Sequence, residues 1–125
     1  MGATVTATNW HSGNAGADTG ATRGWLLGHF IEPPGDVRST EDVEVKWGVH
    51  AAGEKRTDWT ADDQRTTLLL LVQGHFRVDL TEGSVPMTEQ GDYAVWGPGI
   101  DHSWEALADS VVITVRWPSS ARAAD

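Results

Sequence analysis

The 125-residue chain contains no cysteine. Disulfide bonds and thiolate-bound metal sites are therefore excluded, and stability must come from packing or from oligomerisation. The chain also lacks any apolar run near the roughly 20 residues that a membrane-spanning helix needs, and residues 1–10 have neither the basic nor the apolar part of a secretory leader. We therefore expect a cytoplasmic protein without a membrane partner.

Basic residues are scarce. The chain has 9 Lys and Arg against 18 Asp and Glu, which gives a formal net charge of -9 and a sequence pI near 4.8. Such a chain repels the phosphate backbone, so nucleic acid is not expected as a partner. The length fits one domain with a modest core.

Tryptophan, by contrast, is abundant. The chain has seven tryptophans but only one tyrosine and two phenylalanines. Large amphipathic rings either fill a core or line a ligand pocket. We expect most of the seven to lie in the core and a minority to face a cavity.

Apolar residues and turn signals alternate along the chain in a pattern that predicts several short strands. Strands are predicted over 23–31, 43–50, 66–72, 75–80 and 111–117, with a further short one within 81–90. The run 66–72 is almost continuously apolar, which is typical of a strand buried on both faces, and Gly74 indicates a hairpin to the next strand. No long helical period is present. The pattern therefore predicts an all-β sandwich or barrel.

Small and polar residues dominate the two ends of the chain. Residues 11–22 are rich in Gly, Ala, Ser and Thr and have no apolar period. We therefore predict a flexible N-terminal arm at 1–22, a single β domain at 23–118 and a short polar tail at 119–125.

The strand predicted over 43–50 has one valine-rich face and one polar face. In a plain sandwich the valine face would form the core. In a barrel with a polar interior, the face with Lys46 and His50 would look inward, and a bulge at Gly48 could also redirect His50. The sequence leaves this direction open.

The most informative stretch runs from Gly91 to Trp104. It reads as a strand, a tight Gly97-Pro98-Gly99 turn, and a second strand that begins near His102. The glycines and the proline fix the direction in which the chain enters that second strand. His102 is therefore the first candidate for a functional residue.

This stretch resembles the second motif of the cupin superfamily. The glycine, proline, glycine and histidine positions of that motif fall on Gly91, Gly97, Gly99 and His102. Gly97 departs from the usual proline, which here is the next residue. The resemblance covers roughly residues 43–117 and implies a single-domain cupin jelly roll.

The first cupin motif usually supplies two histidines and a glutamate that hold a divalent metal together with the second-motif histidine. Counting back from Gly74 places these three positions on Ala61, Asp63 and Thr67. Alanine has no donor atom, and a neutral hydroxyl binds divalent ions weakly. We therefore expect no metal and no cofactor at the usual site.

A rewired metal site is an alternative. Imidazoles from separate strands can converge on one metal ion, so His50 or His75 could join His102 in a metal-dependent oxygenase or isomerase. However, no two of the five histidines are spaced i, i+2 or i, i+4, the spacings that place two side chains on one face of a strand or helix.

Our first hypothesis is a metal-free cupin whose pocket binds a small organic molecule. In this hypothesis His102 is the catalytic candidate, for metal-free acid–base chemistry. The candidate ligand-binding residues are Trp59, Asp63, Thr67, Trp96 and Trp104. Arg77 could also bind a carboxylate, although exposure to solvent is the simpler expectation.

The third possibility is that His102 only hydrogen-bonds within a packed core and the fold serves an interaction role. Cupins commonly pair, and we expect a homodimer in which Trp10, Trp25 and Phe30 could cover an interface.

Overall fold

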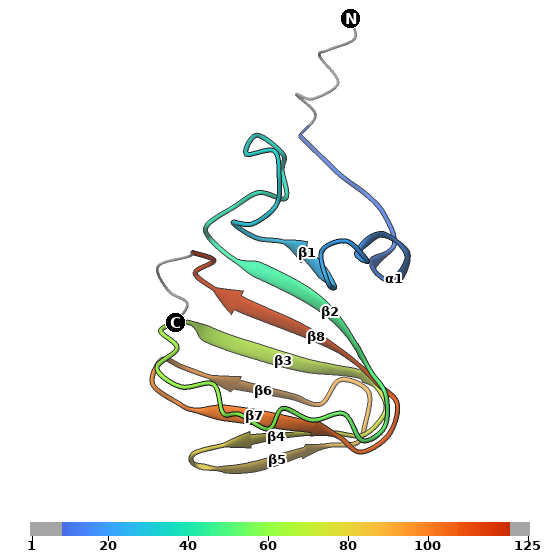
Figure 1. The fold of residues 1–125 in the computed structure, drawn as a ribbon, viewed down its shortest axis with the longest axis vertical. Coiled ribbons are helices and arrows are strands. Elements are labelled where there is room, and N and C mark those ends of the chain that lie inside the picture. The colour runs from blue at the N-terminus through green and yellow to red at the C-terminus, as the bar shows by residue number, and fades with distance from the viewer. Residues whose placement is uncertain (1–8, 121–125) are drawn as a thin grey trace, which may run out of the picture.

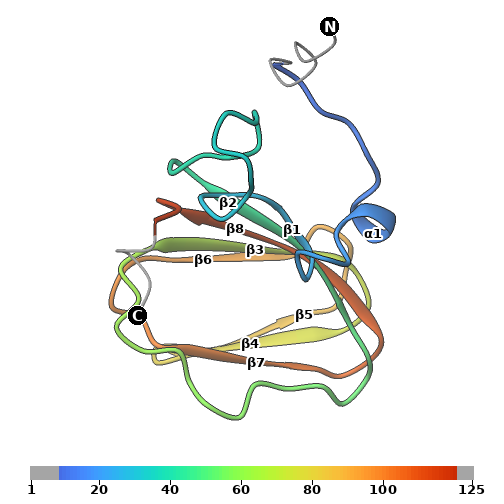
Figure 2. The same cartoon turned by 45° about the horizontal axis from the view of Figure 1, so that its top comes forward.

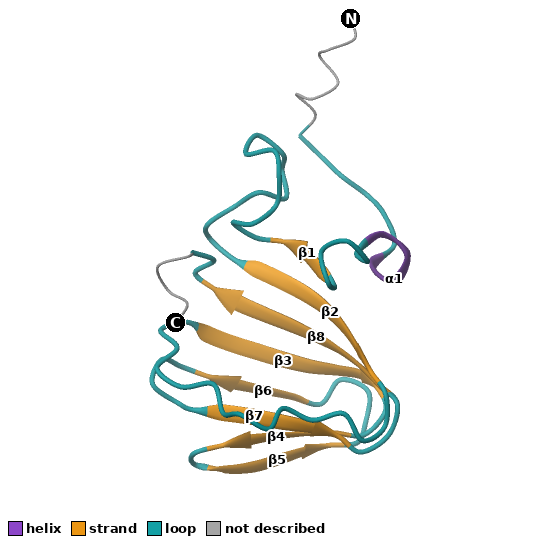
Figure 3. Cartoon of the chain, in the orientation of Figure 1, coloured by secondary structure: helices purple, strands orange, loops and turns teal. Residues whose placement is uncertain are grey.

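The computed structural model describes residues 9–120 and shows two antiparallel sheets with almost no helix (Figures 1 and 3). Its elements are α1 (Ala15–Asp18), β1 (Trp25–Leu27), β2 (Glu44–His50), β3 (Thr66–Gln73), β4 (Phe76–Leu80), β5 (Gly83–Met87), β6 (Tyr93–Trp96), β7 (His102–Ala106) and β8 (Ser110–Trp117). None of the helices in this part of the chain is long and apolar enough to cross a membrane.

The five-stranded sheet has the order β1-β2-β8-β3-β6, and the three-stranded sheet has the order β5-β4-β7. Figure 2 shows the two sheets facing each other, as in a jelly roll. The all-β prediction is confirmed. The first strand is shorter than predicted, because only Trp25–Leu27 pairs with β2. Parts of the predicted arm and tail, residues 1–8 and 121–125, lie outside the described residues.

The connection at Gly74 is a corner between the sheets, so the predicted hairpin between β3 and β4 is wrong. β3 pairs with β6 and β8, whereas β4 pairs with β5 and β7. Gly74 has a φ of 109° and lies directly against the backbone that leads into β8. The next amide, that of His75, donates to Ser110 Oγ at 3.1 Å, which fixes the corner.

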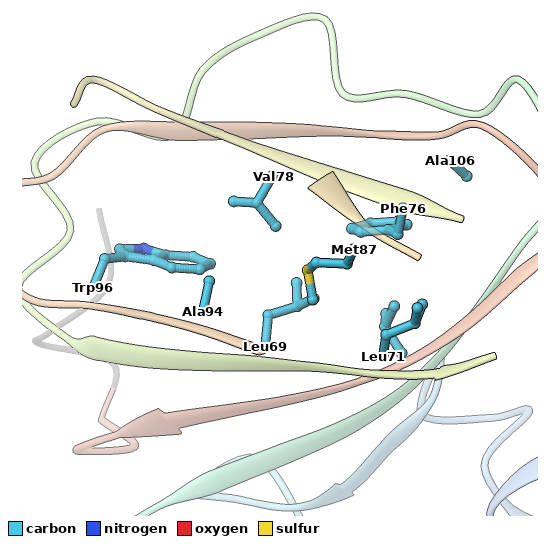
Figure 4. Packing of buried hydrophobic residues seen from close by; sticks show 9 residues of the cluster. Leu69, Leu71, Phe76, Val78, Met87, Ala94, Trp96 and Ala106 are labelled. Carbon is cyan, nitrogen blue, oxygen red and sulfur yellow. The ribbon is translucent and has the colours of Figure 1, made fainter. Parts of the chain in front are cut away.

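The inner faces of both sheets form the apolar core. In β3 the inward residues Thr67, Leu69 and Leu71 are buried, whereas Leu68 and Leu70 are only half-buried. The prediction that this strand is buried on both faces is therefore wrong, because its second face lies on the outside of the sandwich. Figure 4 shows the core cluster, which consists of Leu69, Leu71, Phe76, Val78, Met87, Ala94, Trp96, Ala106 and Val112.

The polar face of β2 points into the sandwich. Lys46 pairs with Thr114 of β8, and Thr114 pairs with the buried Leu69 of β3, so all three share the inner face. On the opposite face, Val49 is 67% exposed. The structure thus selects the barrel-like alternative, with Lys46 and His50 directed inward.

The segment between β2 and β3 runs beside β7 as an irregular fourth strand of the small sheet (Figure 2). Isolated bridges join Lys55 to Glu105 and Thr60 to His102. The Arg56 amide also donates to the Trp104 carbonyl at 3.0 Å. This pairing places residues of a loop next to the strand that begins with His102.

We expect Gly74→Ala to lower the free energy of unfolding by about 1–3 kcal/mol. The substituted residue would have to keep a φ of 109°, and its Cβ would lie 2.5 Å from the Asp109 carbonyl oxygen. Urea unfolding measures the change. Gly91→Ala is the matched control, because Gly91 has a φ of 94° but nothing within 4 Å of an added Cβ. Equal losses in the two variants would contradict close packing at the corner.

Candidate ligand-binding site

A cavity of about 240 Å³ lies between the two sheets. Its lining includes Thr67 of β3, Trp96 of β6, His102 and Trp104 of β7, and Arg116 of β8. Thr67 pairs with both Trp96 and Arg116 in the five-stranded sheet, so these three side chains form one inward row. The row faces His102 and Trp104 across the sandwich.

His102 occupies the first position of β7, as the turn before it predicts. Its amide donates to the Thr60 carbonyl at 3.1 Å, and its carbonyl accepts from the Thr60 amide at 2.8 Å. The imidazole packs against Trp96 with ring centroids 4.9 Å apart. Burial lowers the pKa of His102, and the Asp63 carboxylate and the backbone of Ile100 offset part of that shift. The ring is therefore mainly neutral at neutral pH.

Three buried side-chain polar atoms lack a hydrogen-bond partner in residues 9–120. They are Thr67 Oγ1, His102 Nδ1 and Arg116 Nε. All three belong to residues that line the cavity. A buried polar atom without a partner costs roughly 1–3 kcal/mol, so such atoms are uncommon and call for an explanation. Their convergence on one cavity is the clearest mark of a site for a polar ligand.

An ion-pair network around Glu44 fixes Arg116 at the cavity. Glu44 is 1% exposed, and its Oε2 accepts from Arg116 Nη2 at 2.6 Å and from Arg65 Nη1 at 2.9 Å. Its Oε1 accepts from Ser119 Oγ at 2.9 Å. Burial lowers the pKa of Arg116, but a guanidinium remains protonated at neutral pH. The cavity therefore has a fixed positive group.

Asp63 belongs to this network and not to the cavity lining. Its two carboxylate oxygens accept from Arg65 Nε at 2.8 Å and Nη2 at 2.7 Å. Burial alone would raise the pKa of Asp63, but the hydrogen bonds from Arg65 outweigh it and lower the pKa. Trp59 is 48% exposed and also lies outside the lining. Neither of these predicted ligand-binding residues thus lines this cavity, because Asp63 is ion-paired with Arg65 and Trp59 is largely exposed.

The residues at the usual cupin metal positions do not fit a divalent ion. Ala61 offers no donor, Thr67 offers a neutral hydroxyl, and the Asp63 carboxylate is occupied by Arg65. The rewired set is assembled only in part, because His50 and His102 both line the cavity whereas His75 lies outside its lining. No group of three or more His, Cys, Asp or Glu within residues 9–120 is placed to hold a metal.

His50 does line the cavity, on the inward face of β2. Its ring packs against Trp104 at 4.4 Å and Phe76 at 5.5 Å, and its Nδ1 lies 3.0 Å from Glu54 Oε1. Unlike His102, it thus has a side-chain partner. It contributes mainly an aromatic surface to the cavity.

Arg56 and Arg116 line the cavity although the sequence pattern does not predict them there, whereas Lys46 is expected there in the barrel-like alternative for β2. A signal existed for Arg116, because Thr114 and Arg116 alternate with the apolar Ile113, Val115 and Trp117 along the last strand. Arg77, the guanidinium that the sequence did single out, bonds to Asp79 at 2.8 Å and Glu105 at 3.1 Å. It does not line the cavity.

The arrangement of strands is that of the cupins, and comparison with solved structures confirms this. A cupin protein from Bacteroides fragilis has a TM-score of 0.67 and 16% identity, over 91% of this chain and 88% of that one. KdgF from a Halomonas species has a TM-score of 0.58 and 26% identity, over 65% and 74%. An RmlC-like cupin from Shewanella frigidimarina has a TM-score of 0.58 and 17% identity, over 66% and 71%.

The chain therefore has the cupin fold, as the resemblance of its second motif implied. No family model matches its sequence. No curated protein matches it either. The likeness is thus one of fold, and the chemistry of the site must be argued from its own residues.

We expect the free energy of unfolding to decrease as the pH is lowered, and protonation of His102 to account for part of that decrease. Because its pKa is lower in the folded than in the unfolded chain, the unfolded chain binds the proton first as pH falls from about 7 to 5, which favours unfolding. His102→Asn should therefore show a smaller loss of unfolding free energy over this range, measured in urea at both pH values. A loss equal to that of the unsubstituted protein would show that His102 does not have a lowered pKa.

Proposed function

We propose that this cupin binds a small organic molecule in the cavity between its sheets, without a metal ion. The observation that supports this most directly is that Thr67, His102 and Arg116 each have a buried polar atom without a partner at the same cavity. A ligand with polar groups would satisfy these atoms. It would recover the free energy that their desolvation costs.

Aromatic side chains give this cavity surfaces for a planar or apolar ligand body. Trp104 stacks on Phe76 with centroids 5.2 Å apart, and Trp96 packs on His102. Small-molecule sites typically combine such surfaces with a few polar groups, in volumes of roughly 300–1,000 Å³. The cavity of about 240 Å³ lies just below that range, which favours a small ligand.

His102 is the residue that would transfer a proton if binding is followed by conversion. Its pKa is lowered by burial, so the imidazole is available as a base near neutral pH, and Nδ1 has no competing partner within residues 9–120. Any such chemistry would proceed without a Lewis acid, because the donor set does not fit a metal. Binding is the part of the proposal that the cavity supports most strongly.

We further propose that the protein forms a homodimer through the outer face of the five-stranded sheet. One outward row consists of Val95, Leu68, Val115 and Val45, and the next of Tyr93, Leu70, Ile113 and Trp47. Val95 is 50% exposed and Tyr93 is 63% exposed. A twofold dimer pairs the same patch from each subunit, and this uncharged face avoids the repulsion expected between two copies with a net charge of -9.

This interface differs from the one expected from the sequence. Trp25 lines the cavity and packs on Phe30 with centroids 5.0 Å apart, so its ring is not free to cover a partner. Trp10 is 70% exposed and belongs to neither outward row of the sheet. The continuous apolar rows of the sheet are the better surface.

A screen of small acids, alcohols, amides and amines, followed by tryptophan fluorescence, tests the proposed binding. We expect Thr67→Val to weaken the ligands found by about fivefold to tenfold, since it removes one hydrogen-bonding group. The same variant should unfold at an unchanged or higher urea concentration, because it removes a buried hydroxyl without a partner. Thr66→Val, one residue earlier and outside the lining, should change neither property.

Two outcomes would contradict this proposal. The first is that no compound in the screen changes fluorescence or thermal stability. The second is that untagged protein contains stoichiometric transition metal and loses its ligand with a chelator, which would favour the metal-dependent enzyme.

We expect sedimentation equilibrium to show a dimer, and Val95→Lys to convert it to a monomer. The lysine would place a charge within an apolar interface, where it has no partner. Thr81→Lys adds the same charge in the exposed turn between β4 and β5 and should leave the dimer intact. A monomeric unsubstituted protein, or a dimer that tolerates Val95→Lys, would overturn this interface.

A further inference from the structure

The charge of the cavity is opposite in sign to that of the chain. Lys46, Arg56 and Arg116 line the cavity, and none of its lining residues is Asp or Glu. Three of the chain's 9 basic residues thus meet at one cavity, while none of the acidic residues within 9–120 lines it. Charge of one sign concentrated in a cleft raises the local concentration of oppositely charged ligands.

Lys46 has no carboxylate counter-ion among residues 9–120. It lies on the inward face of β2, with Nζ 5.5 Å from the centroid of the Trp25 ring. It has no salt bridge to any carboxylate of residues 9–120 under a 4.0 Å limit. Burial lowers its pKa, and repulsion from Arg116, Arg23 and Arg56 lowers it further. An anion beside Nζ would stabilise the charged ammonium and so raise this pKa.

The acidic groups behind the cavity are already matched. Glu44 and Asp63 bind Arg65 and Arg116, so these two carboxylates and two guanidinium groups balance. Lys46 takes no part in these ion pairs. Arg116 also keeps one buried donor, Nε, free of any partner within the described chain. A guanidinium donor and an ammonium at one cavity form a typical carboxylate site.

We propose, on the basis of the binding function above, that the ligand is a small organic carboxylate. Its carboxylate group accepts hydrogen bonds from Arg116 and Lys46, and its apolar or planar body packs against Trp96 and Trp104. The aromatic lining is the reason for an organic acid in place of an inorganic anion, because phosphate would leave those surfaces without contact. Neutral His102 and Thr67 remain available to the rest of the ligand.

Three ligands of nearly the same shape test this assignment: benzoate, benzamide and benzamidinium, which are anionic, neutral and cationic. Titration calorimetry with the full chain should show benzoate binding at least tenfold more tightly than benzamide, and no binding of benzamidinium. Benzoate affinity should fall as sodium chloride is raised, because salt screens the attraction. Inorganic phosphate should bind more weakly than benzoate.

Lys46→Met should weaken benzoate binding at least tenfold and leave benzamide binding unchanged. It should not lower the thermal midpoint of the ligand-free protein, because it removes a charge that has no counter-ion in the fold. Lys55→Met is the matched control. It makes the same change at an exposed lysine outside the cavity and should leave benzoate affinity as it was.

The outcomes separate this inference from the proposed function. Equal binding of benzoate and benzamide, or equal effects of the two lysine substitutions, would overturn the carboxylate assignment and leave a cavity that binds small molecules. Binders that are all neutral or cationic in the wider screen, with no binding of benzoate, would do the same. Failure of both the three-ligand series and the screen would overturn the binding function itself.

Discussion

The shape of the cavity depends on one buried carboxylate, that of Glu44. Removing a carboxylate from water costs several kcal/mol unless it is paired and hydrogen-bonded, so its partners must be in place whenever the chain is folded. Those partners are Arg65 before β3, Arg116 near the end of β8, and Ser119 after it. The network thus ties together segments that are far apart in the sequence. Loss of Glu44 would leave guanidinium groups buried without enough partners.

This network makes one end of the sandwich interior polar while the other stays apolar. The inward row Trp96, Thr67, Arg116 and Glu44 crosses four strands. Two rows further along, Leu71 and Val112 lie against the core cluster with Phe76 and Met87. The cavity lies where apolar packing gives way to charged side chains. Site and core are therefore two parts of one interior.

The sequence predicts where the strands and turns lie better than it predicts which strands pair and which face of a strand is buried. Turn chemistry before His102 places it at the first residue of β7, because glycine and proline restrict the local backbone wherever the strand goes. At Gly74 the same kind of signal misleads, since a turn residue does not reveal whether the next strand returns to the same sheet. Alternation in β2 defines two faces, but only its partner Thr114 and the buried Leu69 beyond it show which face is inside. The bond from Arg65 to Glu44 spans 21 residues and leaves no local pattern.

The substituted metal positions and the basic cavity are best understood together. In the cupin pattern, a divalent ion held by histidines and a glutamate supplies positive charge inside the sandwich. Here Ala61 and Thr67 have lost that capacity, and the positive charge comes from Arg116 and Lys46. These groups hold an anion by hydrogen bonds and charge, but they offer no exchangeable coordination position. Electrophilic activation of a ligand would then have to come from hydrogen bonding alone. The function that we propose for this interior is accordingly recognition, with proton transfer at His102 as its extension, because burial keeps that imidazole mainly neutral near neutral pH and its protonation would not break the Glu44 network.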